Sequence, residues 1–333
     1  MPANLTLQYH RAEKAYRQAT TPQEELDCLQ AMLSELPKHK GTDKMQADLK
    51  QKISRAKKDL ADQSKKGSGK SKGSTTRMPR QGAGRAVIIG GGNAGKSQLL
   101  ASLTKAKPNI ADYPFSTTQA MPGMMPWEDV YVQLIDTPPI TADVFDVNTQ
   151  ALIRGAELVL LMLDLGSDEG GDQLLEVVNK INQSKSRLGT ETMINPEDIG
   201  VTYTETLLLA NKIDLAESED RAQFFGEFVD LPFETFSISA LEGTGLKELS
   251  DRIYKAMDVV RVYTKLPKNK EPDMDSPFTV KNGQTLADLA ELVHRDIARN
   301  LKGARVWSSR AHDASHVHVD YVLHDKDIVE LHV

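Results

Sequence analysis

The chain has one cysteine, no long apolar run and no lipidation motif. Cys28 is the only cysteine among 333 residues, so no internal disulfide can form, which excludes a disulfide-stabilised secreted scaffold and favours a reducing compartment. No apolar run approaches the ~20 residues that a helix needs to cross a bilayer, which excludes a helical integral membrane protein. Residues 1–10 also lack the basic start and apolar stretch of a signal peptide. We therefore expect a cytoplasmic protein without a membrane partner.

Charge is spread unevenly along the chain. The whole chain has a net charge of −6, but residues 38–85 hold 15 Lys or Arg and 4 Asp or Glu, a net charge of +11 that leaves −17 for the rest. A basic arm on an acidic body is typical of proteins with an anionic partner. A solvated face or a solubilising linker is the alternative interpretation of this segment.

Composition and periodicity divide the chain into five segments. Residues 1–63 show two amphipathic helical patterns with a break at 41–42, which predicts a helical hairpin. Residues 64–84 are rich in Ser, Gly and Lys and have almost no apolar side chains, as is typical of a flexible basic linker. Residues 85–265 are expected to form the main domain, which a connector at 266–276 joins to a small module at 277–333.

The main domain alternates strand and helix patterns. Strands are expected at 86–89, 130–135, 158–164, 206–210 and 234–239, with helical patterns such as 174–181 and 246–259 between them. This alternation predicts an α/β fold with a mostly parallel, doubly wound sheet that helices cover on both faces.

The last segment reads as an α+β module. A short strand at 278–280 precedes a helix that opens at Thr285 and Asp288 and has its apolar stripe as far as Leu301. Strand patterns follow at 305–307, 317–321 and 328–333. One helix on a small mixed sheet is the expected result.

A glycine-rich loop follows the first strand and fits the pattern G-x-x-x-x-G-K-[ST]. Its backbone N–H groups would wrap phosphates, Lys96 would lie between the β- and γ-phosphates, and the Ser97 hydroxyl would bind Mg²⁺. The helix that follows would direct its N-terminus at the anion. The candidate phosphate-binding residues are Gly90, Gly91, Gly92, Asn93, Ala94, Gly95, Lys96 and Ser97.

The motif N-K-I-D follows the apolar strand at 206–210. A carboxylate at Asp214 can accept from the ring N–H and the exocyclic amine of guanine, a donor pair that adenine lacks, so this residue should select GTP over ATP. Asn211 would support the loop and the base edge, and the stem of Lys212 would pack along the ring. The next strand ends in Ser239, Ala240 and Leu241, which could offer a backbone N–H to the guanine carbonyl oxygen.

The order of these motifs resembles the Obg family of translation-factor-type GTPases, and within it the developmentally regulated GTP-binding (DRG-like) branch. The segment A-D-Y-P-F-S-T-T at 111–118 is similar to Y-P-F-T-T in the first switch of that family. The segments A-R-V-W at 304–307 and D-K-D-I-V-E at 325–330 resemble a TGS domain, which has a ubiquitin-like β-grasp fold. The basic N-terminal helices also resemble the family, whose larger insert is shortened or absent at 184–203.

The resemblance implies a P-loop GTPase that uses Mg²⁺. It makes Thr117 the second side-chain ligand of the ion, Asp136 a ligand through water, and Lys96, Thr117 and Asp136 the catalytic residues. Asn93 stands where several relatives hold K⁺ in place of an arginine finger; the alternative is that Asn93 only caps the loop.

The third motif departs from the family pattern D-x-x-G. Here it reads D-T-P-P, and Pro139 has no N–H to give to the γ-phosphate. Ile140 is apolar where Ras-like enzymes carry a glutamine that positions water, a feature shared with the Obg family. We therefore expect slow hydrolysis of GTP.

Together these features predict a GTP- and GDP-binding switch that hydrolyses GTP slowly with Mg²⁺. The basic N-terminal region and the TGS-like module would dock on RNA, above all the ribosome, and no DNA partner is expected. The alternative function is a guanine-nucleotide-binding adaptor with little or no hydrolysis, because Pro139 replaces the glycine.

Overall fold

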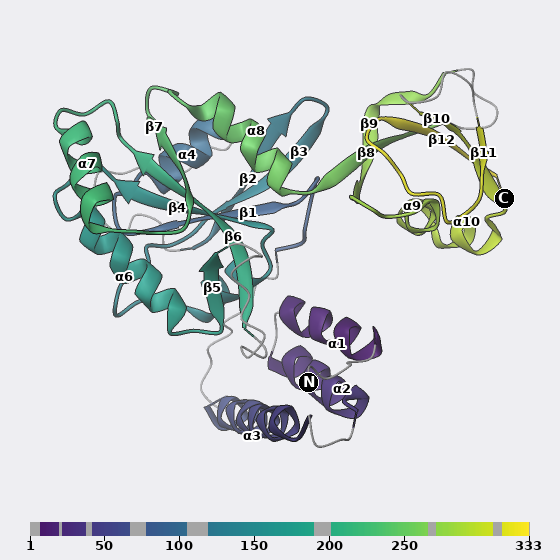
Figure 1. The fold of residues 1–333 in the computed structure, drawn as a ribbon, viewed down its shortest axis with the longest axis horizontal. Coiled ribbons are helices and arrows are strands. Elements are labelled where there is room, and N and C mark those ends of the chain that lie inside the picture. Colours follow the sequence, from purple (N-terminus) through teal and green to yellow (C-terminus); the bar gives the residue numbers. More distant parts are fainter. Residues whose placement is uncertain are drawn as a thin grey trace.

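A computed structural model describes residues 7–19, 22–37, 42–66, 78–104, 119–189, 201–265, 271–308 and 315–332. Figure 1 shows three bodies: an N-terminal group of helices, a central α/β domain and a C-terminal α+β domain. The strand β8 (Val259–Thr264) runs from the central domain into the C-terminal one. No helix in these ranges is both long enough and apolar enough to span a bilayer.

Three helices, rather than the expected two, make up the N-terminal body. They are α1 (Leu7–Gln18), α2 (Pro22–Glu35) and α3 (Asp43–Lys66). The prediction of a hairpin was wrong because α1 is polar on most of its surface and contributes few apolar side chains. Its tyrosines are nevertheless buried in the shared core, which contains Tyr9, Tyr16, Leu29, Met32 and Leu49.

The central domain is built on a seven-stranded sheet. Its path is β2-β3-β1-β4-β6-β5, and β7 pairs with residues 207–211 of β6, beyond the residues 202–205 that pair with β5. All pairs are parallel except that between β2 and β3, so the expected fold class is confirmed. The strands are β1 (Arg85–Gly90), β2 (Met121–Trp127), β3 (Val130–Asp136), β4 (Leu158–Asp164), β5 (Ser186–Gly189), β6 (Thr202–Asn211) and β7 (Glu234–Ile238).

Helices cover the two faces of this sheet and bury a separate core on each. One face lies under α4 (Lys96–Leu103) and α8 (Leu246–Ala256), whose leucines pack on alternate residues of the central strands. The other face lies under α5 (Val147–Arg154) and α6 (Gly170–Asn182), with α7 (Ser218–Phe228) at its edge. The central strands β1 and β4 are buried along their whole length, which explains their unbroken apolar sequence.

Strand register brings the carboxyl ends of the parallel strands to one edge of the sheet. Ile88 pairs with Asp136, Gly90 pairs with Met162, and Asp164 pairs with Asn211. In open α/β sheets, ligands bind at this edge. The glycine-rich loop, the segment D-T-P-P and the motif N-K-I-D each follow a strand that ends there.

The C-terminal domain has a five-stranded sheet in the order β11-β10-β12-β8-β9. Besides β8, its elements are β9 (Asp273–Lys281), α9 (Leu286–Val293), α10 (Arg295–Asn300), β10 (Gly303–Trp307), β11 (Ser315–Val317) and β12 (Asp327–His332). The strand β8 lies inside this sheet, so the domain begins at about Val259 and not at the expected residue 277. The apolar pattern continues from α8 into β8 without a break, so the sequence did not indicate the boundary between the two domains.

The helix of this domain begins as expected but ends early. Thr285 and Asp288 form the capping box of α9, with the Thr285 N–H 2.7 Å from Asp288 Oδ2. The expected single helix to Leu301 is wrong, because His294 is extended and its ring nitrogen accepts from the Asp296 N–H to start α10. Leu292, expected on the buried stripe, is 55% exposed.

Candidate nucleotide-binding site

The glycine-rich loop turns sharply between β1 and α4. Three of its residues have positive φ: Gly90 at 157°, Asn93 at 56° and Gly95 at 90°. A Cβ at Gly95 would lie 2.3 Å from the Asn211 side-chain nitrogen, so glycine is required there. The loop therefore leads directly into the N-terminus of α4, where helix N–H groups favour an anion.

Lys96 is buried in the loop. Its residue is 6% exposed, and its ammonium donates to the carbonyl oxygens of Gly91 (2.6 Å) and Gly90 (3.2 Å). Burial lowers the pKa of Lys96 to about 8, although the nearby Asp136 carboxylate raises it. The Lys96 side chain is thus held in place. Because water does not stabilise its buried ammonium, a bound anion would stabilise that charge strongly.

Ser97 and Asp136 meet beside Lys96. The Ser97 hydroxyl donates to Asp136 Oδ2 at 2.5 Å, although the two residues belong to α4 and β3. Asp136 is 0% exposed at the end of its strand. Hydroxyl and carboxylate oxygens are the ligands that Mg²⁺ prefers, so this pair fits the ion. The third expected ligand, Thr117, lies outside the described residues, together with the rest of the segment 111–118.

The two prolines after Asp136 lead the chain back against the glycine-rich loop. Pro139 is buried, and the Ile140 N–H donates to the Gly90 carbonyl oxygen at 3.2 Å. The Ile140 side chain is 2% exposed and packs into the core between the sheet and α6. Ile140 therefore contributes to the core, and its N–H already has a partner within the protein.

Asn211 joins the two halves of the site. Its side-chain nitrogen donates to Ala94 O and its Oδ1 accepts from the Ala240 N–H, each at 2.9 Å, and the residue is 2% exposed. Asp214 follows three residues later, and its Oδ1 is buried without a hydrogen-bond partner. A buried carboxylate oxygen without a donor is costly unless a ligand supplies one.

Lys212 is held by a residue that the sequence analysis missed. Its ammonium lies 2.7 Å from Asp164 Oδ2, and Asp164 Oδ1 accepts from the Gly166 N–H at 2.8 Å. Lys212 has a φ of 70°, so this ion pair stabilises a strained turn. The position of Asp164 at the end of an apolar strand was the signal that could have identified it.

The loop after β7 uses most of its own backbone donors. The Ser239 N–H donates to Thr244 O at 3.1 Å, and the Ala240 N–H donates to Asn211. Of the three expected residues in this loop, Leu241 is the one whose N–H makes no hydrogen bond within the described residues, so it is available to a ligand. Its side chain is 72% exposed. The structure thus brings the expected residues at 90–97, 136, 211–214 and 239–241 to one edge of the sheet.

Comparison with known proteins agrees with this arrangement. Residues 85–195 match the family described as 50S ribosome-binding GTPase, and residues 260–333 match the TGS domain. An uncharacterized GTP-binding protein of Methanocaldococcus jannaschii is 26% identical in an alignment 365 positions long, gaps included, that covers 93% of this chain and 92% of that protein. Developmentally-regulated G-protein 2 of Arabidopsis thaliana is 27% identical in an alignment 363 positions long, gaps included, that covers 91% of this chain and 89% of that protein.

One solved structure supports the fold. The YchF GTPase of Schizosaccharomyces pombe superposes with a TM-score of 0.51 at 11% identity, covering 76% of this chain and 99% of that one. The resemblance predicted from the motifs is confirmed by the two family matches and by relatives that align over nearly their whole length. The chain is thus similar over nearly its whole length to Obg/DRG-like GTP-binding proteins, and a match to a GTPase family is followed in it by a match to the TGS domain.

Proposed function

We propose that this protein is a switch that binds GTP and GDP, uses Mg²⁺ and hydrolyses GTP slowly. The observation that carries the proposal is the buried, unpartnered Oδ1 of Asp214 beside the loop that Asn211 ties to Ala94. Guanine offers this carboxylate two adjacent N–H donors and adenine does not. The alternative of an ATP-using P-loop protein leaves that oxygen without a donor.

Four residues of this chain would act on the phosphates or on the Mg²⁺ beside them. Lys96, already oriented by two loop carbonyls, would balance charge on the β- and γ-phosphates. Ser97 would hold Mg²⁺ directly, and Asp136 through a water, with Thr117 completing the set. The bound ion would neutralise charge that develops on the transferring phosphoryl group. The backbone N–H groups of the loop residues 90–95 would donate to the phosphates.

Hydrolysis would proceed by positioning and charge stabilisation, without a covalent intermediate. The water oxygen adds to the γ-phosphorus, the bond from the γ-phosphorus to the β–γ bridging oxygen breaks, and GDP leaves with that oxygen. One proton of the water stays on inorganic phosphate and the other passes to solvent. A low rate follows from two features: Pro139 has no N–H for the γ-phosphate, and Ile140 is a core residue that cannot orient water. Asn93, exposed at the outer side of the loop, would hold K⁺ to supply part of the missing charge.

The alternative function is an adaptor that binds guanine nucleotides with little hydrolysis. It is favoured by the same Pro139 and by the use of the Ile140 N–H on Gly90. A ligand that binds two conformations of a protein equally well does not shift the equilibrium between them. An adaptor that does not switch should therefore bind GDP and a non-hydrolysable GTP analogue with similar affinities. A switch predicts different affinities, and calorimetry of the two ligands separates the functions.

We infer that the cytoplasmic partner is RNA, above all the ribosome, contacted by the basic N-terminal region and the TGS domain. Residues 38–85 carry a net charge of +11, and Lys50 and Lys57 are exposed on α3. Phosphate contacts of this kind make affinity fall steeply with salt.

Co-sedimentation of the full-length protein with ribosomes tests the partner. A Lys50→Glu, Lys57→Glu variant should sediment less and show a weaker dependence on salt. A matched Lys247→Glu, Lys255→Glu variant makes the same charge change on α8, where both residues are exposed, and should behave as the wild type. Equal loss in both variants, or none in either, would refute a specific role for the basic arm.

A further inference from the structure

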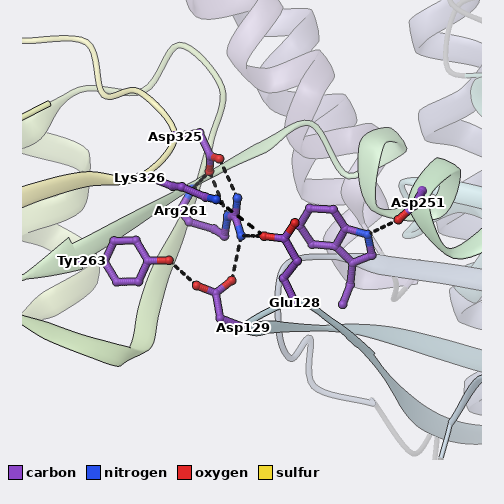
Figure 2. A network of polar contacts seen from close by, with 8 residues as sticks. Glu128, Asp129, Asp251, Arg261, Tyr263, Asp325 and Lys326 are labelled. Carbon is purple, nitrogen blue, oxygen red and sulfur yellow. Dashed lines mark hydrogen bonds and ion pairs between the residues drawn. The ribbon is translucent and has the colours of Figure 1, made fainter. Parts of the chain in front are cut away.

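Arg261 on β8 joins the two larger domains through a dense network of charges. Its residue is 3% exposed, and its Nη1 lies 2.5 Å from Glu128 Oε2 and 2.9 Å from Asp129 Oδ1, both in the turn between β2 and β3. Its Nη2 lies 2.7 Å from Asp325 Oδ2 in the C-terminal domain. Figure 2 shows the guanidinium between these carboxylates, with Lys326 3.8 Å from Glu128. One arginine thus binds acids of both domains.

Aromatic side chains complete the same junction. Trp127 and Tyr254 stack with ring centroids 3.5 Å apart and planes 9° apart, and the Arg261 guanidinium lies 5.2 Å from the Trp127 centroid. The Trp127 indole N–H donates to Asp251 at 2.8 Å. A guanidinium against an aromatic face adds a cation–π attraction to the ion pairs. The turn at 127–129 is therefore held by packing as well as by charge.

Arg261, Asp129 and Asp325 keep their charges over the physiological pH range. Hydrogen bonding to Asp325 is the main reason that the pKa of Arg261 is raised. Burial raises the pKa of Asp129, but hydrogen bonds from Tyr263 and Arg261 outweigh it and leave the pKa below its usual value. The Tyr263 hydroxyl donates to Asp129, and burial together with this bond raises the pKa of the phenol to about 12. The contact is thus a constant mechanical link between the domains.

The turn at 127–129 is the tip of the antiparallel β2–β3 ribbon, whose other end lies in the nucleotide site. The strands β2 and β3 each have seven residues and pair from Trp127 with Val130 to Met121 with Asp136. At ~3.3 Å per residue the ribbon spans about 20 Å. Its base contains Asp136, which contacts Ser97, and it directly follows the segment expected to be the first switch. A fully paired ribbon transmits a shift at its base to its tip, because packed elements move as units.

We propose that Arg261 is a positioning residue of the GTP cycle, which fastens the tip of the β2–β3 ribbon to the TGS domain so that the orientation of this domain follows the bound nucleotide. The inference rests on the proposed function, since it needs two nucleotide states. By linkage, the orientation of the TGS domain also changes the relative affinity for the two nucleotides. A surface engaged by the TGS domain would thereby bias the nucleotide site.

The experiment measures the distance between the domains in each nucleotide state. Spin labels are placed at Glu227→Cys on α7 and Arg299→Cys on α10, both exposed, in a full-length Cys28→Ala background. Distances are recorded with Mg²⁺ and either GDP or a non-hydrolysable GTP analogue, and calorimetry on the same samples measures nucleotide binding. We expect two different, narrow distance distributions in the parent protein.

Variants separate positioning from a merely structural role. Arg261→Gln should give the same broad distribution with both nucleotides and bring the ratio of the two affinities closer to one. Arg261→Lys should rescue the shift only in part, because an ammonium cannot bridge three carboxylates. Arg252→Gln removes an arginine that bridges Glu205 and Glu234 within the GTPase domain, and should leave the shift unchanged. If Arg261→Gln does not fold, Tyr263→Phe removes one bond to Asp129 without changing charge and should reduce the shift.

Each outcome has a defined meaning. Nucleotide binding with equal distances in the two states, or an undiminished shift in the folded Arg261→Gln or Tyr263→Phe variant, overturns this inference alone. Absence of nucleotide binding in calorimetry overturns the proposed function and this inference with it.

Discussion

Replacement of Asp214 by asparagine should convert the base preference of the site. The carboxylate would accept two hydrogen bonds from guanine, and each charge-assisted bond contributes ~1.5–3 kcal/mol. The amide of the Asp214→Asn variant offers an N–H where the base also offers one, so both bonds are weakened or lost. The expected loss is ~3–6 kcal/mol, or roughly 10²- to 10⁴-fold in the affinity for GDP. Xanthine has a carbonyl in place of the exocyclic amine, so binding of its diphosphate should increase.

Isothermal titration calorimetry with GDP and xanthosine diphosphate measures both changes. Asp220→Asn is the matched control, because it makes the same substitution at an exposed carboxylate on α7. The control should bind GDP as the parent protein does. Affinity of Asp214→Asn for GDP within about threefold of the parent, less than a ~1 kcal/mol effect, would refute the role assigned to the buried Oδ1.

Three further predictions concern the loop, the domain junction and the cation. Gly95→Ala should lower the melting temperature by a few degrees and weaken nucleotide binding, because strain of ~1–3 kcal/mol at a φ of 90° adds to a contact with Asn211; an unchanged melt would contradict this. The pKa of Asp129 and of Asp325 lies below the usual value. The contribution of the two ionised carboxylates to the stability of the fold should therefore be complete above about pH 4, and it should be lost as the pH falls through their lowered pKa values in the folded protein. In thermal unfolding measured at a series of acid pH values, Tyr263→Phe should move that loss to higher pH. GTP turnover should be severalfold faster in K⁺ than in Na⁺; equal rates would assign Asn93 to capping the loop.

Strands that are buried on both faces could be predicted well from the sequence. The strand expected at 158–164 agrees with β4 from its first residue to its last, because both faces of a central parallel strand are apolar. The edge strand β2 was missed, since it contains Pro122, Gly123 and Pro126. An edge strand tolerates proline because one of its sides has no partner, and local propensity does not reveal that position.

Elements defined by distant contacts could not be predicted. The strand β8 follows α8 after a short turn, but it pairs with β12, more than sixty residues later in the chain. The helix α1 has little apolar character of its own and is stabilised by packing against α2. In each case tertiary packing decides the structure, and a local pattern contains no information on the partner.

The candidate site shows the same division. Fixed spacing identified the loop at 90–97 and the motif at 211–214, because each motif is local in sequence. Spacing could not show that Asn211 bridges Ala94 and Ala240, or that Ser97 contacts Asp136. It also gave no sign that Arg261 links two domains, since its partners at 128–129 and 325 are far apart in the chain.

Phosphate release from GTP by the purified full-length protein tests the central claim most directly. The assay is run with Mg²⁺ in K⁺ buffer, with and without ribosomes, beside a Lys96→Ala control. We expect slow release of phosphate that ribosomes stimulate and that the Lys96→Ala control lacks. Release no greater than that of Lys96→Ala in either condition would contradict it and favour the nucleotide-binding adaptor, with the missing N–H of Pro139 as the physical reason.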